Sequence, residues 1–335
     1  MIKVLDEGFF TTIQDLGRFG YLRFGISPSG AVDDYSFILG NILLNNDENT
    51  PQLEITLKGP TLEFLVDKIF VIVGGEVEAY LNGKNINSYE VYLAKKGSIL
   101  SIGKVKEGVR AYLIFEGGVK SEKVLGSSSF DRFINKDKIL KKGDLLKVSE
   151  SLDLSLINRI FFKEFKPNFK GDIRVILGPD IDRFEESSID NFFKTDWRVT
   201  EKSDRVAIRL DGIALNFKTK KGTIISEGVN NGTIQVPLDG KPIVLLKDRP
   251  TTGGYPKIAN IISSDIYKIS QKRFNEIIKF KEVTIDEAYK IFKHRVDKIN
   301  EFKVKLGKAR SFYLTIKDKK YKIFIEDIKN EKNSN

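Results

Sequence analysis

The sequence predicts a mainly β protein with a few helices, arranged as two related β-barrel-like domains. One observation behind this prediction is the abundance of short β-branched or aromatic runs that end at Gly, Pro or Asn, a pattern typical of strands. The other is an internal repeat of two short motifs. Closing a sheet into a barrel also removes exposed strand edges, which suits so many short strands.

The expected elements follow in chain order. We expect strands at residues 69–75, 98–102, 110–118, 172–178 and 232–236. Helical periodicity marks residues 29–46, 180–193 and 284–300. Ser29 is a typical N-cap for the first helix, and Thr284 and Glu287 have the spacing of a capping box at the third. Residues 311–328 predict a hairpin that turns at Lys317–Lys320.

The repeat indicates one duplicated module. "LKGPTLEF" (57–64) and "LDGIALNF" (210–217) share L-x-G-x-x-L-x-F, and "LNGK" (81–84) and "LDGK" (238–241) share L-[ND]-G-K. The two motif pairs have nearly the same separation along the chain. We therefore infer two related barrel-like domains with a break between about residues 150 and 170.

Four regions follow from these patterns. The first barrel-like domain is expected to span 1–160, and the second, which carries a "TTGGYP" loop, to span 161–283. A C-terminal helix and hairpin take up 284–328, and 329–335 are expected to be a disordered tail.

Composition narrows the function classes. The chain has 335 residues, 41% hydrophobic and 30% charged, with a net charge of +10. It holds no run near the roughly 20 apolar residues of a membrane span and no signal-peptide pattern at its start, so we expect a cytoplasmic protein with no membrane partner. Because the lysines are dispersed and no nucleic-acid motif accompanies them, we expect no nucleic-acid partner.

Missing residue types exclude further chemistry. The chain has no Cys, a single His (His294) and no P-loop for ATP. These absences exclude a cysteine nucleophile and thiolate metal sites, and they argue against histidine-based catalysis. We expect no metal and no cofactor bound by this chain, and acid–base chemistry must fall to carboxylates, Lys or Tyr.

The segment "KDRPTTGGYPKIA" (247–259) holds the main site candidates. It directly follows the apolar run 242–246, where a strand ends, and it carries more polar groups than a turn needs. Cations there would hold a small carboxylate or carboxyl-phosphate, and a carboxylate or phenol would move a proton. The catalytic candidates are Lys247, Asp248 and Tyr255. The substrate-binding candidates are Arg249, Thr251, Thr252, Gly253 and Gly254. The alternative is a turn with a surface ion pair.

Further candidates lie outside this segment. Gln235 could offer its amide to the same pocket or be satisfied by backbone. Near the first helix, the candidates are Arg18, Ser27, Gly30 and Asp33: Arg18 would bind a carboxylate and the helix start would favour an anion. The alternative is that Asp33 and Ser29 only stabilise the first helical turn. Residues 203–205 are expected to be a turn that leads into a strand, and 127–129 to be loop or capping residues.

Four blocks of the chain resemble a known family. They are "TTIQDLGRFGYLRFGISPSGAVD" (11–33), "AYLIFEGGVKSEKVLGSSSF" (111–130), "WRVTEKSDRVAIRLDG" (197–212) and "SEGVNNGTIQVPLDGKPIVLLKDRPTTGGYPKIA" (226–259). They resemble, in order, the biotin-dependent carboxyltransferase / allophanate hydrolase subunit 2 family. That family includes the C-type subunits of 5-oxoprolinase, the KipA proteins and the carboxyltransferase domain of urea carboxylase. Ala207 and Phe274–Asn275 depart from its pattern at turn or packing positions.

The resemblance implies a pair of cyclophilin-like β-barrels and three possible roles. The first is the C-type component of an ATP-dependent 5-oxoprolinase, inactive alone, with a small carboxylate as substrate. ATP would then be bound by one of two partners, an A-type or a B-type (KipI-like) protein. The second role is a carboxyltransferase subunit of the urea carboxylase type, and the third is a KipA-like regulator that binds a kinase inhibitor. Biotin would arrive in trans, because the chain lacks the Met-Lys-Met of a biotinylated domain.

Overall fold

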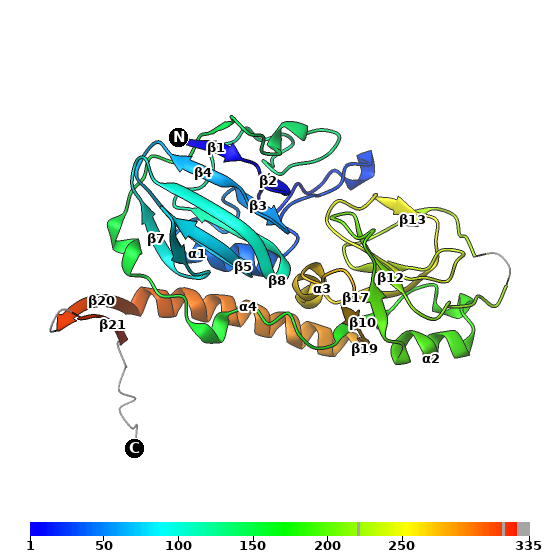
Figure 1. Cartoon of the computed structure of the whole chain (residues 1–335). Helices are drawn as coiled ribbons and strands as arrows, with labels where there is room; N and C mark the ends of the chain where they lie inside the picture. Colours follow the sequence, from blue (N-terminus) through cyan, green and yellow to red (C-terminus); the bar gives the residue numbers. More distant parts are fainter. Residues whose placement is uncertain (220–221, 317–318, 327–335) are drawn as a thin grey trace, which may run out of the picture.

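The computed structural model describes residues 1–219, 222–316 and 319–326. Two mainly antiparallel sheets make up most of the described structure, and α4 lies beneath both (Figure 1). The mainly β fold with two barrel-like sheets is therefore confirmed. Within these ranges no helix is long and apolar enough to cross a membrane.

The first sheet has nine strands in the order β2-β3-β8-β4-β1-β9, with β5 joining β6, β7 and β8. Its strands are β1 (Ile2–Asp6), β2 (Phe10–Gln14), β3 (Gln52–Thr56), β4 (Thr61–Phe64), β5 (Lys68–Leu81), β6 (Lys84–Ile86), β7 (Val91–Ala94), β8 (Ile99–Phe115) and β9 (Leu145–Leu146). β8 corrects the prediction of separate strands at 98–102 and 110–118. The charged, Gly-containing stretch between them stays paired with β5, and register shifts in β5 absorb the irregularity.

The second sheet has eight strands in the order β18-β11-β12-β15-β14-β17-β10-β19. They are β10 (Ile173–Leu177), β11 (Trp197–Val199), β12 (Ala207–Asp211), β14 (Thr233–Gln235), β15 (Ile243–Leu245), β17 (Lys257–Ile261), β18 (Ile277–Ile278) and β19 (Phe280–Glu282). β13 (Glu227–Gly228) and β16 (Thr252–Gly253) form a separate ribbon at one end of this barrel (Figure 1).

The two copies of the repeated motif differ in local structure but both reach a core. Leu62 and Phe64 lie in β4 and are fully buried in the first core. Leu215 follows β12, outside any named strand, and is buried in the second core, against which Phe217 packs. The first sheet occupies residues 2–146 and the second 173–282. The domain boundaries proposed at 160 and 283 stay predictions.

Four α-helices accompany the sheets in the described ranges: α1 (Asp34–Leu43), α2 (Glu186–Lys194), α3 (Ile266–Ser270) and α4 (Ile285–Lys308). Thr284 and Glu287 form the predicted capping box, with Thr284 N donating to Glu287 Oε2 (2.8 Å) and Glu287 N donating to Thr284 Oγ1 (3.2 Å). Ser29 does not cap α1. It has a φ of +54° and donates to Asp131 (3.2 Å), and Asp33 is the N-cap instead.

A third core lies between α1, β5 and α4. Every α1 residue except Asp34 is buried, because α4 closes the side of α1 that the sheet leaves open. Phe302 and Leu306 of α4 complete this core. The buried surface of α1 is therefore wider than the single apolar stripe of a surface helix.

The predicted C-terminal hairpin is present as β20 (Ala309–Ile316) and β21 (Lys319–Glu326), which pair antiparallel. Its tip at residues 317–318 and the tail at 329–335 lie outside the described residues. The hairpin extends from the far end of α4, away from both barrels (Figure 1).

Candidate functional site

Arg205 lies at the junction of the two sheets. It lies two residues before β12, and its side chain is 5% exposed. Its Nε and Nη2 donate to the two oxygens of Asp248, at 2.8 and 3.0 Å. On the other side, Nη1 donates to Glu54 of β3 and Nη2 donates to the Gly30 carbonyl (2.8 Å). One guanidinium therefore joins a carboxylate of each sheet.

Glu54 is the buried anion on the first-sheet side. It accepts hydrogen bonds from Val32 N (3.0 Å) and the Tyr112 hydroxyl (2.8 Å), and Arg110 Nε lies 3.6 Å away. Burial works to raise the pKa of Glu54, but the guanidiniums of Arg205 and Arg110 hold it below its usual value. The same burial, with Glu54 beside it, raises the pKa of Tyr112 well above its usual value. Glu54 is thus a fixed negative charge.

A cleft of about 650 Å³ opens above this ion pair. Arg110, Arg205 and Asp248 lie among its lining residues. The first-sheet side contributes Phe9, Phe10, Thr56, Leu57, Val109, Phe130 and Arg132, and the second-sheet side Thr200, Glu201, Ser203, Asp204, Ile208, Lys272 and Phe274. Apolar walls around a few convergent polar groups are typical of small-molecule sites.

Asp248 lines this cleft, and its side chain is only 8% exposed. The alternative of a surface ion pair with Lys247 or Arg249 is therefore wrong, since its partner is Arg205. The expectation that residues 203–205 form only a turn is also wrong for Arg205.

Lys247 and Arg249 flank Asp248. Within the described residues, neither cation has an ion-pair partner, since no carboxylate lies within 4.0 Å of it. Arg249 is 4% exposed and donates only to the carbonyls of Val229 (3.2 Å) and Leu246 (3.3 Å). Burial lowers its pKa to about 10 and lowers that of Lys247 as well. These two cations can receive an anion.

Arg18 and Ser27 bring the first half of the chain to the same region. Ser27 Oγ donates to the Arg249 carbonyl (2.5 Å). Arg18 is 2% exposed, and its Nη2 donates to the Ser129 carbonyl (2.7 Å), whereas its Nε and Nη1 have no hydrogen-bond partner among the described residues. Its nearest carboxylate is Asp131, at 3.9 Å. Burial lowers the pKa of Arg18.

A buried network around Asp15 supports Arg18. Asp15 Oδ1 accepts from Gly17 N (2.8 Å) and from the hydroxyls of Ser127 and Ser129 (2.6 Å each). Its Oδ2 accepts from Ser128 N (2.7 Å). The three serines, expected to be loop or capping residues, are fully buried. They fix the carbonyl to which Arg18 donates.

Gly30 and Asp33 have structural roles. Gly30 has a φ of +93°, and a Cβ there would lie 2.6–2.7 Å from the backbone of Leu16 and Gly17. Asp33 accepts from Ser36 N (3.0 Å), Ser36 Oγ (2.6 Å) and Gln271 Nε2 (2.8 Å). Burial raises its pKa to about 6. Its carboxylate is thus fully used in hydrogen bonds to Ser36, at the start of α1, and to Gln271.

The rest of the "TTGGYP" loop turns toward its own barrel. Gln235 Nε2 donates to the Tyr255 carbonyl (3.0 Å), and a Cβ on Gly253 would lie 2.5 Å from that same nitrogen. Gly253 and Gly254 both lack a positive φ, so close packing, and not a left-handed backbone, is what requires Gly253. Thr251 is half-buried, and Thr252 pairs within the β13–β16 ribbon.

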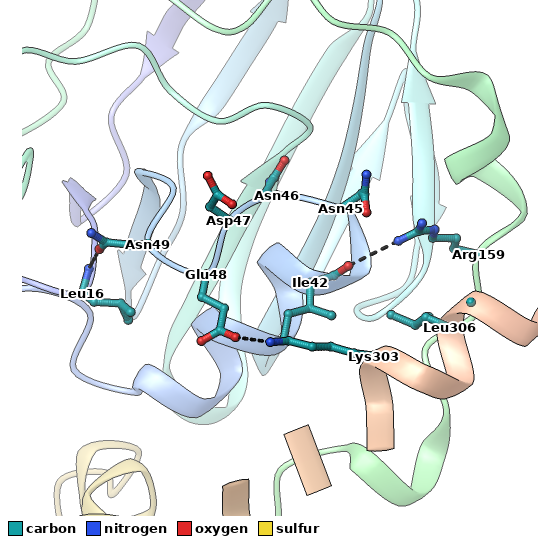
Figure 2. A pocket seen from close by; sticks show the side chains of 11 residues that line it. Leu16, Ile42, Asn45, Asn46, Asp47, Glu48, Asn49, Arg159, Lys303 and Leu306 are labelled. Atoms are coloured by element: carbon teal, nitrogen blue, oxygen red, sulfur yellow. Dashed lines mark hydrogen bonds and ion pairs between the residues drawn. The ribbon is translucent and has the colours of Figure 1, made fainter. Parts of the chain in front are cut away.

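A larger cavity of about 730 Å³ lies elsewhere, where α4 passes the end of α1 (Figure 2). Its charged groups are mostly paired with each other or with backbone. Lys303 pairs with Glu48 (2.6 Å), and Arg159 donates to the carbonyls of Ile42 (3.3 Å) and Leu43 (3.1 Å). The smaller interdomain cleft is therefore the better candidate site.

Similarity to known proteins agrees with this architecture. A family model described as the carboxyltransferase domain, subdomain A and B, matches residues 24–282. The C subunit of 5-oxoprolinase from Escherichia coli is 34% identical over 298 residues, which cover 87% of this chain and 94% of that protein. Its counterpart from Haemophilus influenzae is 36% identical over 295 residues, with the same coverage.

Larger proteins match over a part of their length. The urea amidolyase of Saccharomyces cerevisiae is 32% identical over 315 residues, which cover 86% of this chain and 17% of that protein. The crystal structure of Kluyveromyces lactis urea carboxylase superimposes with a TM-score of 0.82 at 30% identity, over 90% of this chain and 29% of that one. By sequence and by fold, this chain belongs to the family of carboxyltransferase domains with subdomains A and B.

Proposed function

We propose that this chain is the C-type component of an ATP-dependent 5-oxoprolinase, which opens 5-oxoproline to glutamate together with two partner subunits. The observation that carries the proposal is that the alignment covers most of this chain and most of each 5-oxoprolinase relative. The chain matches 94% of the length of both 5-oxoprolinase relatives but 17% of the yeast urea amidolyase. A match along nearly the whole of a relative supports a separate subunit of that kind.

The interdomain cleft and the residues next to it together offer the groups that this substrate needs. Lys247 and Arg249 do not line the cleft, but they flank its residue Asp248, and the carboxylate of 5-oxoproline would bind these two cations. Asp248, oriented by two hydrogen bonds from Arg205, keeps lone pairs that can accept the lactam N–H. Ring opening adds water to the lactam carbonyl and breaks the C–N bond, and the departing nitrogen takes up a proton. The lowered pKa of Lys247 suits it to donate that proton.

ATP chemistry is assigned to the partners, one A-type and one B-type (KipI-like) protein. The chain has no P-loop, so the isolated chain should neither hydrolyse ATP nor release glutamate. The experiment is co-purification with the products of neighbouring genes, followed by a glutamate-release assay with 5-oxoproline and ATP. Substantial turnover by the isolated chain, with partners excluded, would remove the obligate-subunit proposal.

Asp248→Asn tests the role of the cleft. It keeps the size of the side chain but replaces one acceptor oxygen with a donor that faces Arg205. In the reconstituted complex we expect turnover to fall by about 10²- to 10⁴-fold. The melting temperature of the variant alone should change by only a few degrees. Asp172→Asn, at an exposed carboxylate that does not line the cleft, is the matched control and should keep its activity.

The second candidate is a biotin-dependent carboxyltransferase subunit. The superposition on urea carboxylase supports it. Biotin would have to come from a carrier protein, because the single Met of this chain is Met1. Carboxyl transfer from a carboxylated biotin carrier to urea, with no glutamate release in the first assay, would favour this role. A KipA-like regulatory role stays a prediction, and it would be favoured by tight binding to a kinase inhibitor with neither activity.

A further inference from the structure

A third cavity, of about 220 Å³, lies between α4, residues 164–168 and the start of α3. It shares no lining residue with the interdomain cleft. Its charged lining residues are Lys166, Arg174, Arg295, Lys298 and Glu164. Four cations to one carboxylate make it the most cationic of the cavities described above.

Three of these cations already have partners outside the cavity lining. The pairs are Arg174 with Asp265, Arg295 with Asp34, and Lys166 with Glu76. Arg174 uses Nε (2.8 Å) and Nη2 (2.6 Å), and Arg295 Nη2 lies 2.7 Å from its carboxylate partner. These pairs fix the guanidinium groups in place at the cavity wall, so the site is built rather than formed from mobile surface lysines.

Lys298 is the cation that remains. It is half-buried, and no ion pair or hydrogen bond to its amine occurs in the described part of the chain. The one carboxylate of the lining, Glu164, is held by Lys305 at 2.6 Å. The cavity therefore has an ammonium group with no anion to neutralise it.

Ser264 gives an independent indication of a missing acceptor. It is 4% exposed and lines the cavity, and within the described residues its Oγ has no hydrogen-bond partner. Buried hydroxyls are nearly always hydrogen-bonded, so one without a partner next to a cationic cavity calls for a ligand. Because a hydroxyl donates as readily as an ammonium, both point to a ligand that accepts.

We propose that this cavity is a binding site for a small oxyanion, a phosphate or carboxylate group, held by Lys298, Arg295 and the hydroxyl of Ser264. Charge-assisted hydrogen bonds from cations to oxyanions are the strong ones, and the volume excludes a nucleotide. Arg295 and Lys298 belong to α4, beyond the segment 24–282 that matches the family model. The site is thus built with a helix outside that matched segment.

The test uses the full chain and two probes, inorganic phosphate and acetate. Isothermal titration calorimetry should show saturable binding of at least one probe. The same probe should raise the melting temperature by a few degrees over sodium chloride of equal ionic strength. Binding of phosphate only or of acetate only identifies the preferred class, and either supports the site.

Variants distinguish anion binding at this site from a general effect of salt on the protein. Lys298→Gln should weaken binding at least tenfold. Ser264→Ala should weaken it several-fold, yet melt no lower than the wild type without anion, because it removes an unsatisfied hydroxyl. Lys293→Gln, an exposed lysine of the same helix, is the control and should bind as the wild type does. Wild-type affinity in both Lys298→Gln and Ser264→Ala, or no saturable binding of either probe, would overturn the proposal.

Discussion

The two clusters of buried charge near the junction of the sheets satisfy their carboxylates in different ways. Asp15 receives four hydrogen bonds from neutral donors, and all of them come from the first half of the chain. Glu54 and Asp248 instead share Arg205 and come from opposite halves. The carboxylate of the first cluster takes all its hydrogen bonds from one half of the chain, whereas the second cluster joins the two halves. Cations with unused donors lie beside both clusters: Arg18 beside the first, and Lys247 and Arg249 beside the second.

Arg205→Met should have the largest effect. It leaves two carboxylates buried without their shared cation, which costs about 3–5 kcal/mol of unfolding free energy. We also expect the single unfolding transition to broaden or divide, because the link between the halves is lost. Urea unfolding followed by tryptophan fluorescence and by far-UV circular dichroism measures both effects. Arg132→Met, which breaks an exposed pair in the same cleft, should cost about 0–1 kcal/mol.

Asp33 is a further buried carboxylate, and its contribution to the stability of the protein depends on pH. Its folded carboxyl has a pKa of about 6 and binds a proton more tightly than the unfolded one, whose pKa is near 3.8. Its contribution to stability is therefore fully present below pH 3.8 and is lost as the pH rises through 6, a change of about 3 kcal/mol. Asp33→Asn should remove this fall from a series of urea unfolding curves between pH 4 and 7. An identical pH profile in wild type and variant would contradict the assignment.

Asp15→Asn tests the first cluster. The amide nitrogen must face one of the four donors, so one buried hydrogen bond is lost at a cost of about 1–3 kcal/mol. Because the network lies within one half of the chain, unfolding should stay a single transition. If Asp15→Asn divides the transition as Arg205→Met is expected to do, the distinction between the two clusters fails.

Thr284→Ala should have the smallest effect, and its loss of stability is a reference for the losses of the other variants. It removes one half of an exposed capping box at the start of α4, which typically costs about 1 kcal/mol. Thermal melts detect such a change, and the pH profile should not move. A loss as large as that of Arg205→Met would show that α4 contributes far more than its exposed start suggests.

The sequence predicts local features well and contacts between distant segments poorly. The capping box of Thr284 and Glu287 was predictable because both partners lie within one turn. Asp248 and Arg249 were singled out because polar residues follow an apolar strand. Arg205 was interpreted as part of a turn, since its partner Glu54 lies 151 residues away and no local pattern reports such a pair. The reason for the glycine at 253 was equally hidden, because the neighbour that leaves no room for a side chain there is Gln235, which lies on another strand.

The position of α4 has a consequence for how the chain folds during synthesis. Helix α1 forms part of a core that Phe302 and Leu306 complete, and these two residues are translated long after α1. The first sheet can close early, but the apolar surface of α1 stays open until α4 has left the ribosome. Nascent chains that lack α4 therefore expose this surface, and it is where a chaperone or premature aggregation would act.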